Sequence, residues 1–520
     1  MWRWILIAVA VLFVLSVLAL WSWGHFAQRA RGQPSTALPV AADATRLDRL
    51  IAPLLAAQAP GASGAALISH PEQAFVARAR GARAAERSLD VQYYIWRHDL
   101  TGRLLENELL AAADRGVRVR LLIDDMNVAG RDDILLAMDA HPNLEVRIFN
   151  PARSRAGGLR RAIEMGLRFV GFNRRMHNKA WIADNRLAIV GGRNVGDEYF
   201  GASENTNFQD ADLLMVGPAV AQTSAIFDAF WNSAAVVPLG ALHEGSARLS
   251  PEALAAERRK WLAEVGAQPW VKALAANDDT DERLRRGAVT FYWTPNLRVV
   301  SDPPEKAAPV ASRRERAAWL LYDVNALLYS ARHDSWLISP YFVPGEAGTL
   351  MLAGQAARGM QVRVLTNSLA ANDVPLVHAG YIDYRAALLA QGVSLYELKP
   401  GASSPDRELI GSSGASLHTK AFVVDGQRGF VGSFNFDPRS AQLNTEMGVM
   451  FDHPALAAEV KQMFDHGTRP ESAWRVTLAE DGSLRWHGAA GRVWTEEPET
   501  GAGLRLLVWL MSFLPIESQL

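Results

Sequence analysis

Apolar positions recur along the chain both as short continuous runs and at helical spacing. In the first half, residues 89–96 predict a strand, residues 104–115 an amphipathic helix that Gly116 ends, and residues 117–123 the next strand. In the second half, residues 335–342, 350–358 and 361–366 predict the same three elements, with Gly359 as the break. A further helix and strand follow each time. Strands that alternate with helices are typical of an α/β sheet, so we expect two similar α/β halves.

The N-terminal apolar segment predicts a membrane anchor. Residues 4–23 carry no charge, and a helix of that length rises roughly 30 Å, enough to cross a bilayer core. Trp residues lie near both ends of the segment, where aromatic belts form. A cleaved signal peptide is the alternative, but its apolar core is usually shorter and no clear cleavage site follows. We therefore favour an uncleaved anchor, whose flanking arginines do not decide its orientation.

The C-terminal apolar segment, residues 504–514, is too short to span a bilayer and ends at Pro515. Two interpretations are open. It is either an interfacial helix with Trp509 at the lipid headgroups, or a last helix packed on the domain.

Changes in composition along the chain suggest where its domains and linkers begin and end. We expect an anchor with its flank at residues 1–31 and a Pro/Ala/Gly-rich tether at 32–45, long enough to hold a soluble body off the membrane. Half 1 is expected at 46–300, a linker at 301–316, half 2 at 317–480 and a C-terminal segment at 481–520. Residues 251–274 predict a helical excursion without a counterpart in the second half.

One set of polar residues occurs twice at the same spacing. The first copy has His177, Lys179, Asp184, Gly191, Gly192 and Asn194, and the second has His418, Lys420, Asp425, Gly432, Ser433 and Asn435. Two matches over this length indicate a duplicated half-site. If both segments are strands, alternation places each His and its Lys on one face. Packing of the halves about a pseudo-twofold axis would then bring two imidazoles, two ammonium groups and two amides into one pocket.

Such a pocket suits phosphodiester exchange. A neutral imidazole attacks phosphorus to form a phosphohistidine, and a protonated imidazole gives its proton to the leaving alkoxide. Both forms are accessible because the imidazole pKa lies near neutrality. The Lys and Asn side chains would stabilise the charge that builds on the phosphoryl oxygens. This chemistry needs no metal and no cofactor. Asp184 and Asp425 follow apolar strands, so a turn-capping role fits them as well as a catalytic one.

An acidic partner on the other ring nitrogen makes an imidazole a better nucleophile. Glu446 lies 28 residues after His418 and is the candidate in the second half. Asp210 or Asp212 would serve the first half, with a short insertion.

Composition narrows the function classes. The chain has 520 residues and no Cys, which excludes disulfides, thiolate zinc sites and Cys nucleophiles. Its formal net charge of −1 gives no support for non-specific binding to nucleic acid.

The paired motifs resemble those of the phospholipase D superfamily, over about residues 60–480. The strings at 191–200, 432–440, 444–448 and 514–517 look closer to bacterial cardiolipin synthases of the C type. The resemblance implies two α/β halves with a shared site and a phosphohistidine. It implies the following roles: His177 as nucleophile, His418 as acid, Lys179, Lys420, Asn194 and Asn435 as phosphate binders, Ser433 as a hydroxyl donor, and Glu446 as the orienter of His418. Gly192 departs from the pattern, since Ser433 fills that place in the second copy.

Three further residues are candidates for the border of the pocket. Tyr94 and Tyr341, near the ends of equivalent strands, would line a headgroup pocket or belong to the core. His378 lies in a loop between repeat elements.

The resemblance also implies a substrate. A phosphatidyl group would pass from phosphatidylethanolamine or phosphatidylglycerol to phosphatidylglycerol, giving cardiolipin at the bacterial inner membrane. A hydrolase with water as acceptor is the first alternative. A membrane-tethered nuclease fits the near-neutral charge less well, and a non-enzymatic scaffold with a relic site fits the two complete motifs less well.

Overall fold

The computed structural model describes residues 2–40, 44–128, 131–155, 158–243, 249–276, 289–308, 313–401 and 415–520. Residues 41–43 of the predicted tether and 309–312 of the predicted linker lie outside the described residues.

The described residues of the first half form a nine-stranded sheet in the order β10-β1-β8-β6-β5-β2-β3-β4-β9. Its strands are β1 (Ser63–Ile68), β2 (Ser88–Tyr93), β3 (Arg118–Asp124), β4 (Leu144–Phe149), β5 (Ala180–Ala183), β6 (Leu187–Gly191), β8 (Asp212–Val216), β9 (Val236–Pro238) and β10 (Tyr292–Thr294). The neighbours β2, β3 and β4 are parallel, and the other pairs are antiparallel.

The described residues of the second half form a ten-stranded sheet in the order β11-β18-β17-β16-β12-β13-β14-β19-β20-β21. Its strands are β11 (Arg298–Ser301), β12 (Asp334–Ile338), β13 (Gln361–Asn367), β14 (Ser394–Leu398), β16 (Lys420–Val424), β17 (Arg428–Gly432), β18 (Met447–Asp452), β19 (Ala473–Leu478), β20 (Leu484–His487) and β21 (Val493–Trp494). From β11 to β19 the order and the sense of each pair repeat those from β1 to β9. The prediction of two similar α/β halves is confirmed. Strands β20 and β21 show that part of the predicted C-terminal segment extends this sheet.

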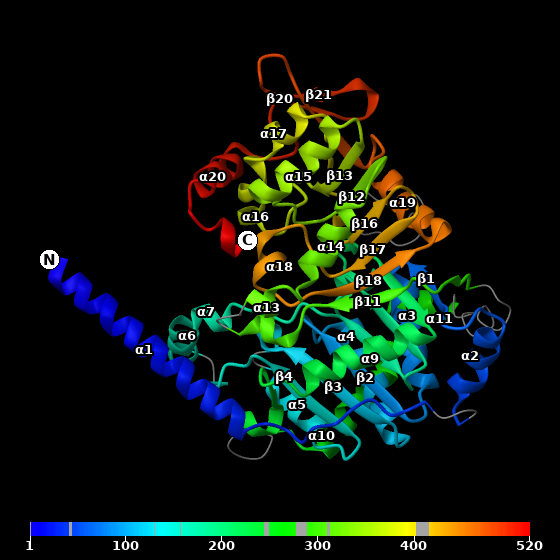
Figure 1. Ribbon diagram of the computed structural model, residues 1–520. Helices are drawn as coiled ribbons and strands as arrows, with labels where there is room; N and C mark the ends of the chain where they lie inside the picture. The colour runs from blue at the N-terminus through cyan, green and yellow to red at the C-terminus, as the bar shows by residue number, and fades with distance from the viewer. Residues whose placement is uncertain are drawn as a thin grey trace.

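Helices cover both sheets (Figure 1). In the first half they are α2 (Arg46–Ala56), α3 (Pro71–Ala84), α4 (Leu100–Asp114), α5 (Asp132–Asp139), α6 (Gly158–Leu167), α7 (Phe169–Phe172), α8 (Asp197–Phe200), α9 (Pro218–Trp231), α10 (Pro251–Val265) and α11 (Pro269–Ala276). In the second half they are α13 (Arg313–Arg316), α14 (Leu320–Tyr329), α15 (Gly345–Ala357), α16 (Pro375–Ile382), α17 (Arg385–Ala390), α18 (Pro438–Gln442), α19 (Pro454–Gly467) and α20 (Ala502–Ser512). Helices α10 and α11 are the predicted excursion.

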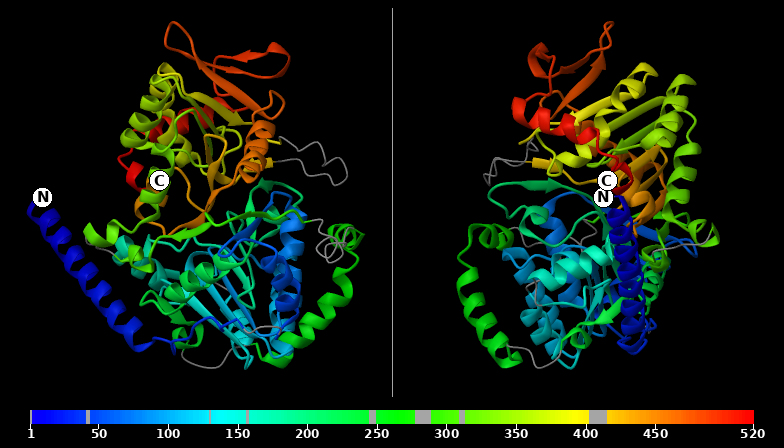
Figure 2. Two further views of the ribbon diagram at one scale, coloured as in Figure 1. Left: turned by 45° about the vertical axis from the view of Figure 1, so that its right-hand side comes forward. Right: turned by 90° about the vertical axis from the view of Figure 1, so that its left-hand side faces the viewer.

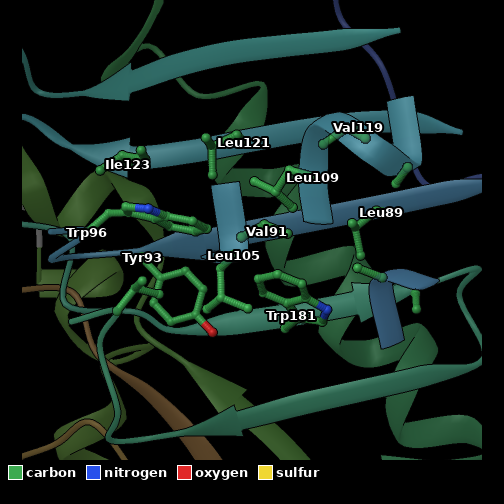
Figure 3. Close-up of a cluster of buried hydrophobic side chains, with 14 of the residues drawn as sticks. Leu89, Val91, Tyr93, Trp96, Leu105, Leu109, Val119, Leu121, Ile123 and Trp181 are labelled. Atoms are coloured by element: carbon green, nitrogen blue, oxygen red, sulfur yellow. The ribbon is translucent and has the colours of Figure 1, made fainter. Parts of the chain in front are cut away.

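The packing of the core explains why the sequences of the central strands are continuous apolar runs. In the first half, β2 and β3 pack their alternate side chains against α4, with Leu105 and Leu109 facing Val91 and Leu121 (Figure 3). The opposite faces of both sheets contribute to a second core, in which α9 and α19 lie. Because this second core contains residues of both halves, burial of its apolar surface holds the two sheets together across the site.

The N-terminal helix α1 (Trp2–Arg29) contains an 18-residue stretch with a mean hydropathy of 2.8 and is long and apolar enough to cross a membrane. It projects from one side of the body (Figures 1 and 2). Only its last turns pack on the first half. Trp23 Nε1 donates to the carbonyl of Pro151 at 3.0 Å, and Ala27 is buried.

The segment after α1 differs from the predicted free tether. Residues 33–39 lie along the surface of the first half, where their carbonyls accept hydrogen bonds from Arg87, Arg118, Arg120 and Arg147 at 2.6–3.0 Å. Gly32 fits closely here, since a Cβ would lie 2.6 Å from the Arg147 guanidinium. We call residues 32–40 the strap. Pro and Gly made the segment look like a spacer, but its carbonyls are fixed by arginines that are distant in sequence.

Candidate active site

The two motif histidines lie at the interface between the halves, immediately before the motif strands rather than inside them. Met176 forms a parallel bridge with Thr445, and the His177 N–H donates to the Thr445 carbonyl at 2.8 Å. In the symmetric position, β15 (Ala415–Leu417) pairs in parallel with β7 (Asn207–Gln209). The His418 N–H there donates to the Gln209 carbonyl at 2.8 Å. Each His is therefore positioned by backbone of the opposite half.

This pairing crosses the acids between the halves. His177 Nδ1 lies 2.7 Å from Glu446 Oε2, and His418 Nδ1 lies 2.5 Å from Asp210 Oδ2. The expectation that Glu446 orients His418, with a first-half acid for His177, is wrong. Glu446 directly follows Thr445 and Asp210 directly follows Gln209, so the parallel bridges bring each acid next to the other half's imidazole. Of the two first-half candidates, Asp212 pairs instead with Arg78 and Arg193.

The two acids are supported differently. Ser433 Oγ donates to Glu446 Oε2 at 2.5 Å, and the Glu446 N–H donates to the buried carboxylate of Asp302 at 2.9 Å. Gly192 stands in the place of Ser433, and a Cβ there would lie 2.2 Å from Asp210 Oδ1. In the first copy, Asp210 therefore occupies the space in which a serine side chain at position 192 would lie.

Both motif lysines are buried beneath the imidazoles. Lys179 Nζ donates to the His177 carbonyl at 2.6 Å, and Lys420 Nζ donates in the same way to the His418 carbonyl. Burial lowers the pKa of Lys420 to about 8 and lowers the pKa of Lys179 as well. Burial also raises the pKa of Glu446 to about 7.

The electrostatics of the site favour neutral imidazoles. Burial, followed by the charges of both lysines, lowers the pKa of His177 and of His418 well below the usual range. That both lysines act on both rings shows that the four groups share one site. A bound phosphodiester anion would offset the lysine charges and raise the imidazole pKa values again.

The two asparagines are not equivalent. Asn194 Oδ1 accepts from the Ile95 N–H at 3.1 Å, and its Nδ2 donates to the Tyr199 hydroxyl at 3.0 Å. Asn435 Oδ1 is buried and has no partner in the described part of the chain. Asn435 Oδ1 is thus free to accept a hydrogen bond, whereas the Asn194 amide holds the first half-site together.

Aromatic side chains enclose the imidazoles. The ring of Tyr94 meets that of His177 edge-on with centroids 5.1 Å apart, so Tyr94 lies in the site. The sequence did not single out Tyr199 and Phe208, whose rings lie 5.2 Å from that of His418. The Tyr341 hydroxyl donates to the exposed carboxylate of Asp373 at 2.9 Å. Burial raises the pKa of Tyr94 to about 12, so its phenol stays protonated.

Asp184 and Asp425 are not part of this cluster. Asp184 follows β5, and its carboxylate accepts from the backbone N–H groups of residues 86, 87 and 88 at 2.8–3.0 Å. Asp425 accepts in the same way from residues 332, 333 and 334. Seven residues of extended chain separate each from its His, about 20 Å. Both have positive φ, 50° and 53°, in the turn after the strand. Their contacts are those of turn caps.

His378 does not reach the imidazoles either. It is buried in α16, where its Nε2 lies 3.3 Å from Glu497 Oε1 and 3.4 Å from Arg385 Nη2. Arg385 also binds Glu397. The ring belongs to a buried ionic network of the second half. Among the described residues, no group of three or more His, Asp or Glu side chains could hold a metal ion.

Comparison with known proteins agrees with this geometry. Residues 81–231 and 324–467 match the family model "Cardiolipin synthase, PLD-like domain". The chain is 41% identical to cardiolipin synthase C of Escherichia coli over 483 residues, which cover 91% of this chain and 99% of the relative. An uncharacterized protein of Helicobacter pylori is 31% identical over 88% of this chain and 89% of its own.

Among solved structures, phosphatidylserine synthase of Haemophilus influenzae superimposes with a TM-score of 0.57 at 12% identity, covering 88% of this chain and 95% of that one. This likeness shows a shared fold. On the family match and on the identity to its relatives, the chain belongs to the cardiolipin synthase family with PLD-like domains.

Proposed function

We propose that the protein is a membrane-anchored phosphatidyltransferase that makes cardiolipin. It transfers a phosphatidyl group from phosphatidylethanolamine or phosphatidylglycerol to phosphatidylglycerol through a phosphohistidine. One observation supports the proposed chemistry above all: two imidazoles, each next to a carboxylate of the opposite half, lie in one site with two buried lysines. The name of the Escherichia coli relative supports the choice of lipid.

In the first step, neutral His177 attacks phosphorus through Nε2 while Glu446 holds its Nδ1–H. The bond from phosphorus to the headgroup oxygen breaks. Protonated His418 gives its Nε2 proton to that oxygen, and Asp210 stabilises the imidazolium before transfer. The low pKa of His418 fits this role, because a bound phosphodiester anion would raise it until the proton is transferred.

In the second step, the phosphohistidine is attacked by a hydroxyl of phosphatidylglycerol. His418, now neutral, accepts the hydroxyl proton, the new oxygen–phosphorus bond forms and the phosphorus–nitrogen bond to His177 breaks. Lys179, Lys420 and the Asn435 amide stabilise the negative charge on the phosphoryl oxygens in both steps.

The candidate membrane anchor supports the proposal that the substrates are membrane lipids. Helix α1 is a candidate span, and Trp23 and the strap fix its end on the body, which favours a retained anchor over a cleaved signal peptide. We place the protein in the bacterial inner membrane with its lipid substrates.

The deciding experiment uses the full chain in vesicles of labelled phosphatidylglycerol, with and without phosphatidylethanolamine, and mass analysis of the products. We expect cardiolipin, with ethanolamine released if phosphatidylethanolamine is the donor and glycerol if phosphatidylglycerol is. The His177→Ala chain should make none. Phosphatidic acid as the sole product would mean that water is the acceptor and that the protein is a hydrolase.

A further inference from the structure

Three short helices, α6, α7 and α20, carry large apolar side chains outward into solvent. On α6 and α7 these are Leu159, Ile163, Phe169 and Val170, which are 52–77% exposed. On α20 and the two residues after it they are Leu506, Trp509, Leu510, Phe513 and Leu514, which are 51–67% exposed. Groups of exposed large apolar side chains are uncommon on a soluble protein and mark an interaction site.

The inner face of α20 packs on the body, whereas α6 is held by polar contacts, and the apolar side chains of both lie at the surface. On α20, Val508 is buried in a cluster with Leu369 and Ala379. In α6, Glu164 accepts from the N–H groups of Arg153 and Ser154 at 2.8 Å and pairs with Arg168 at 2.6 Å.

The three helices lie on the side from which α1 projects (Figure 1). Helix α1 contacts α6 directly. The Arg168 guanidinium lies 4.3 Å above the Trp23 ring. When this side faces the viewer, the start of α1 stands in front of the C-terminus (Figure 2, right), and Figure 1 shows that it projects well away from the body. Because the strap fixes the end of α1 on the body, a bilayer that α1 crosses lies on the side of α6 and α20.

The helices α6 and α7 belong to one half and α20 to the other, and Arg439 connects the end of α7 with residues 519 and 520, which follow α20. Its Nη2 donates to the Asn173 carbonyl, next to α7, at 2.9 Å. Its Nη1 donates to the Gln519 carbonyl at 3.2 Å, and its backbone N–H donates to the Leu520 carbonyl at 2.6 Å. Arg439 lies in α18, and its carbonyl accepts from the Asn444 N–H at 2.9 Å, two residues before Glu446. This connection therefore borders the active site.

We propose that α6, α7 and α20 form one membrane-docking surface, which rests on the bilayer that α1 crosses and holds the Arg439 side of the active site against the lipid headgroups. The occupant is a lipid surface. Exposed Arg153 and Arg160 lie beside the apolar residues of α6, where they would meet lipid phosphates. The proposal deepens the proposed function, since it would let a phospholipid reach the imidazoles without leaving the membrane.

The absence of Cys allows a direct test on the full chain. Ile163→Cys and Leu510→Cys chains, and the controls Leu54→Cys in α2 and Val493→Cys in β21, would each carry one environment-sensitive fluorophore in vesicles of phosphatidylethanolamine and phosphatidylglycerol. The control positions are 42% and 50% exposed and lie away from the docking surface. We expect lipid-borne quenchers to quench the two docking labels, and aqueous iodide to quench them at least threefold less than the controls.

Iodide access at the docking positions equal to that of the controls would overturn the proposal. Protection from iodide without quenching by lipid would also overturn it, because a protein contact would then cover the surface. Repeating the labels on a His177→Ala background removes activity from the readout, so the result stands whether or not the protein makes cardiolipin.

A second measurement asks what the surface does. The double variant Ile163→Glu with Leu510→Glu should lose at least tenfold in transfer rate on vesicles and keep its rate on short-chain phospholipids that are dispersed as monomers. The matched control is Leu54→Glu with Val493→Glu, which should keep both rates. Equal rates of the two double variants on vesicles would contradict the proposal.

Discussion

The functional unit at the residue scale is an imidazole with the carboxylate of the other half. Glu446 serves His177 and is itself held by Ser433, whereas Asp210 serves His418 and fills the space left by Gly192. The two histidines therefore have different environments although their motifs match, and this difference can be read out by chemistry.

The crossed assignment predicts which acid acts in which step. Asp210→Asn weakens the general acid, so we expect at least a hundredfold loss of rate on ordinary phospholipid, which is largely restored on phosphatidyl-p-nitrophenol because that leaving group needs no proton. Glu446→Gln weakens the nucleophile and should be slow on both substrates. Burst kinetics of nitrophenol release would measure both effects.

The opposite pattern, with Glu446→Gln rescued by the good leaving group, would mean that His418 is the nucleophile. Asp212→Asn, which alters a carboxylate paired with Arg78 rather than with an imidazole, is the control for general disturbance and should show no leaving-group dependence.

Gly192 is predicted to tolerate no side chain. In Gly192→Ala the new methyl group would meet Asp210 Oδ1 at 2.2 Å, so the carboxylate has to move away from His418. We expect a fall in kcat of at least tenfold, with rescue by the good leaving group confined to the rate of the first step, as for Asp210→Asn. Gly354→Ala, whose Cβ meets no atom closer than 3.7 Å, is the control and should keep its rate.

The pH profile should report Lys420. In the proposed mechanism its ammonium binds the phosphodiester anion, and burial lowers its pKa to about 8, so the charged form is present below pH 8 and is lost as the pH rises. Since kcat/KM reflects the free enzyme, we expect a further fall above about pH 8, beyond the loss that begins at the lower pKa of His418. Lys420→Arg should move this fall to higher pH, because a guanidinium keeps its charge. An unshifted profile would assign the fall to another group.

At the element scale, the turns after the motif strands are held by their aspartates. Asp184→Ala leaves the N–H groups of residues 86–88 without an acceptor, and we expect the free energy of unfolding to fall by about 2 kcal/mol. Asp425→Ala should cost less, because its partners at 332 and 333 are more exposed. Thermal unfolding would measure both losses.

The activity of the same two variants separates a cap from a catalytic group. Measured well below the unfolding temperature, both should keep a transfer rate within about threefold of the unaltered chain. A loss of a hundredfold or more in a folded Asp184→Ala protein would restore a catalytic role to that carboxylate.

The sequence predicted the repeated elements well, because periodicity and glycine breaks act locally. Strands β2, β3, β12 and β13 and helices α4 and α15 lie within a few residues of their predicted positions. The acid pairing could not be predicted in this way. It depends on β7 and β15 meeting across the interface, and no spacing within one half encodes that contact. The strap was missed for the same reason, because its arginine partners lie far along the chain.

At the scale of the whole molecule, the halves form one site within a single chain. Their shared core and the crossed acids mean that a chain lacking either His has no complete site. We therefore expect no recovery of activity when His177→Ala and His418→Ala chains are mixed in the same vesicles. Recovery to a quarter or more of the unmixed rate would show that two chains exchange halves.

The crossed acids also constrain how such a chain could have arisen. One half alone presents an imidazole beside no carboxylate, since its own acid points to where a neighbour's imidazole would be. A single-half ancestor could act only as a pair of identical subunits, each completing the other. Joining two copies in one polypeptide removed the requirement that they stay identical. The two sides could then differ, with Gly192 where the other half has Ser433 and Asp210 where it has Glu446. Two imidazoles with different surroundings can take different roles, one as nucleophile and one as acid.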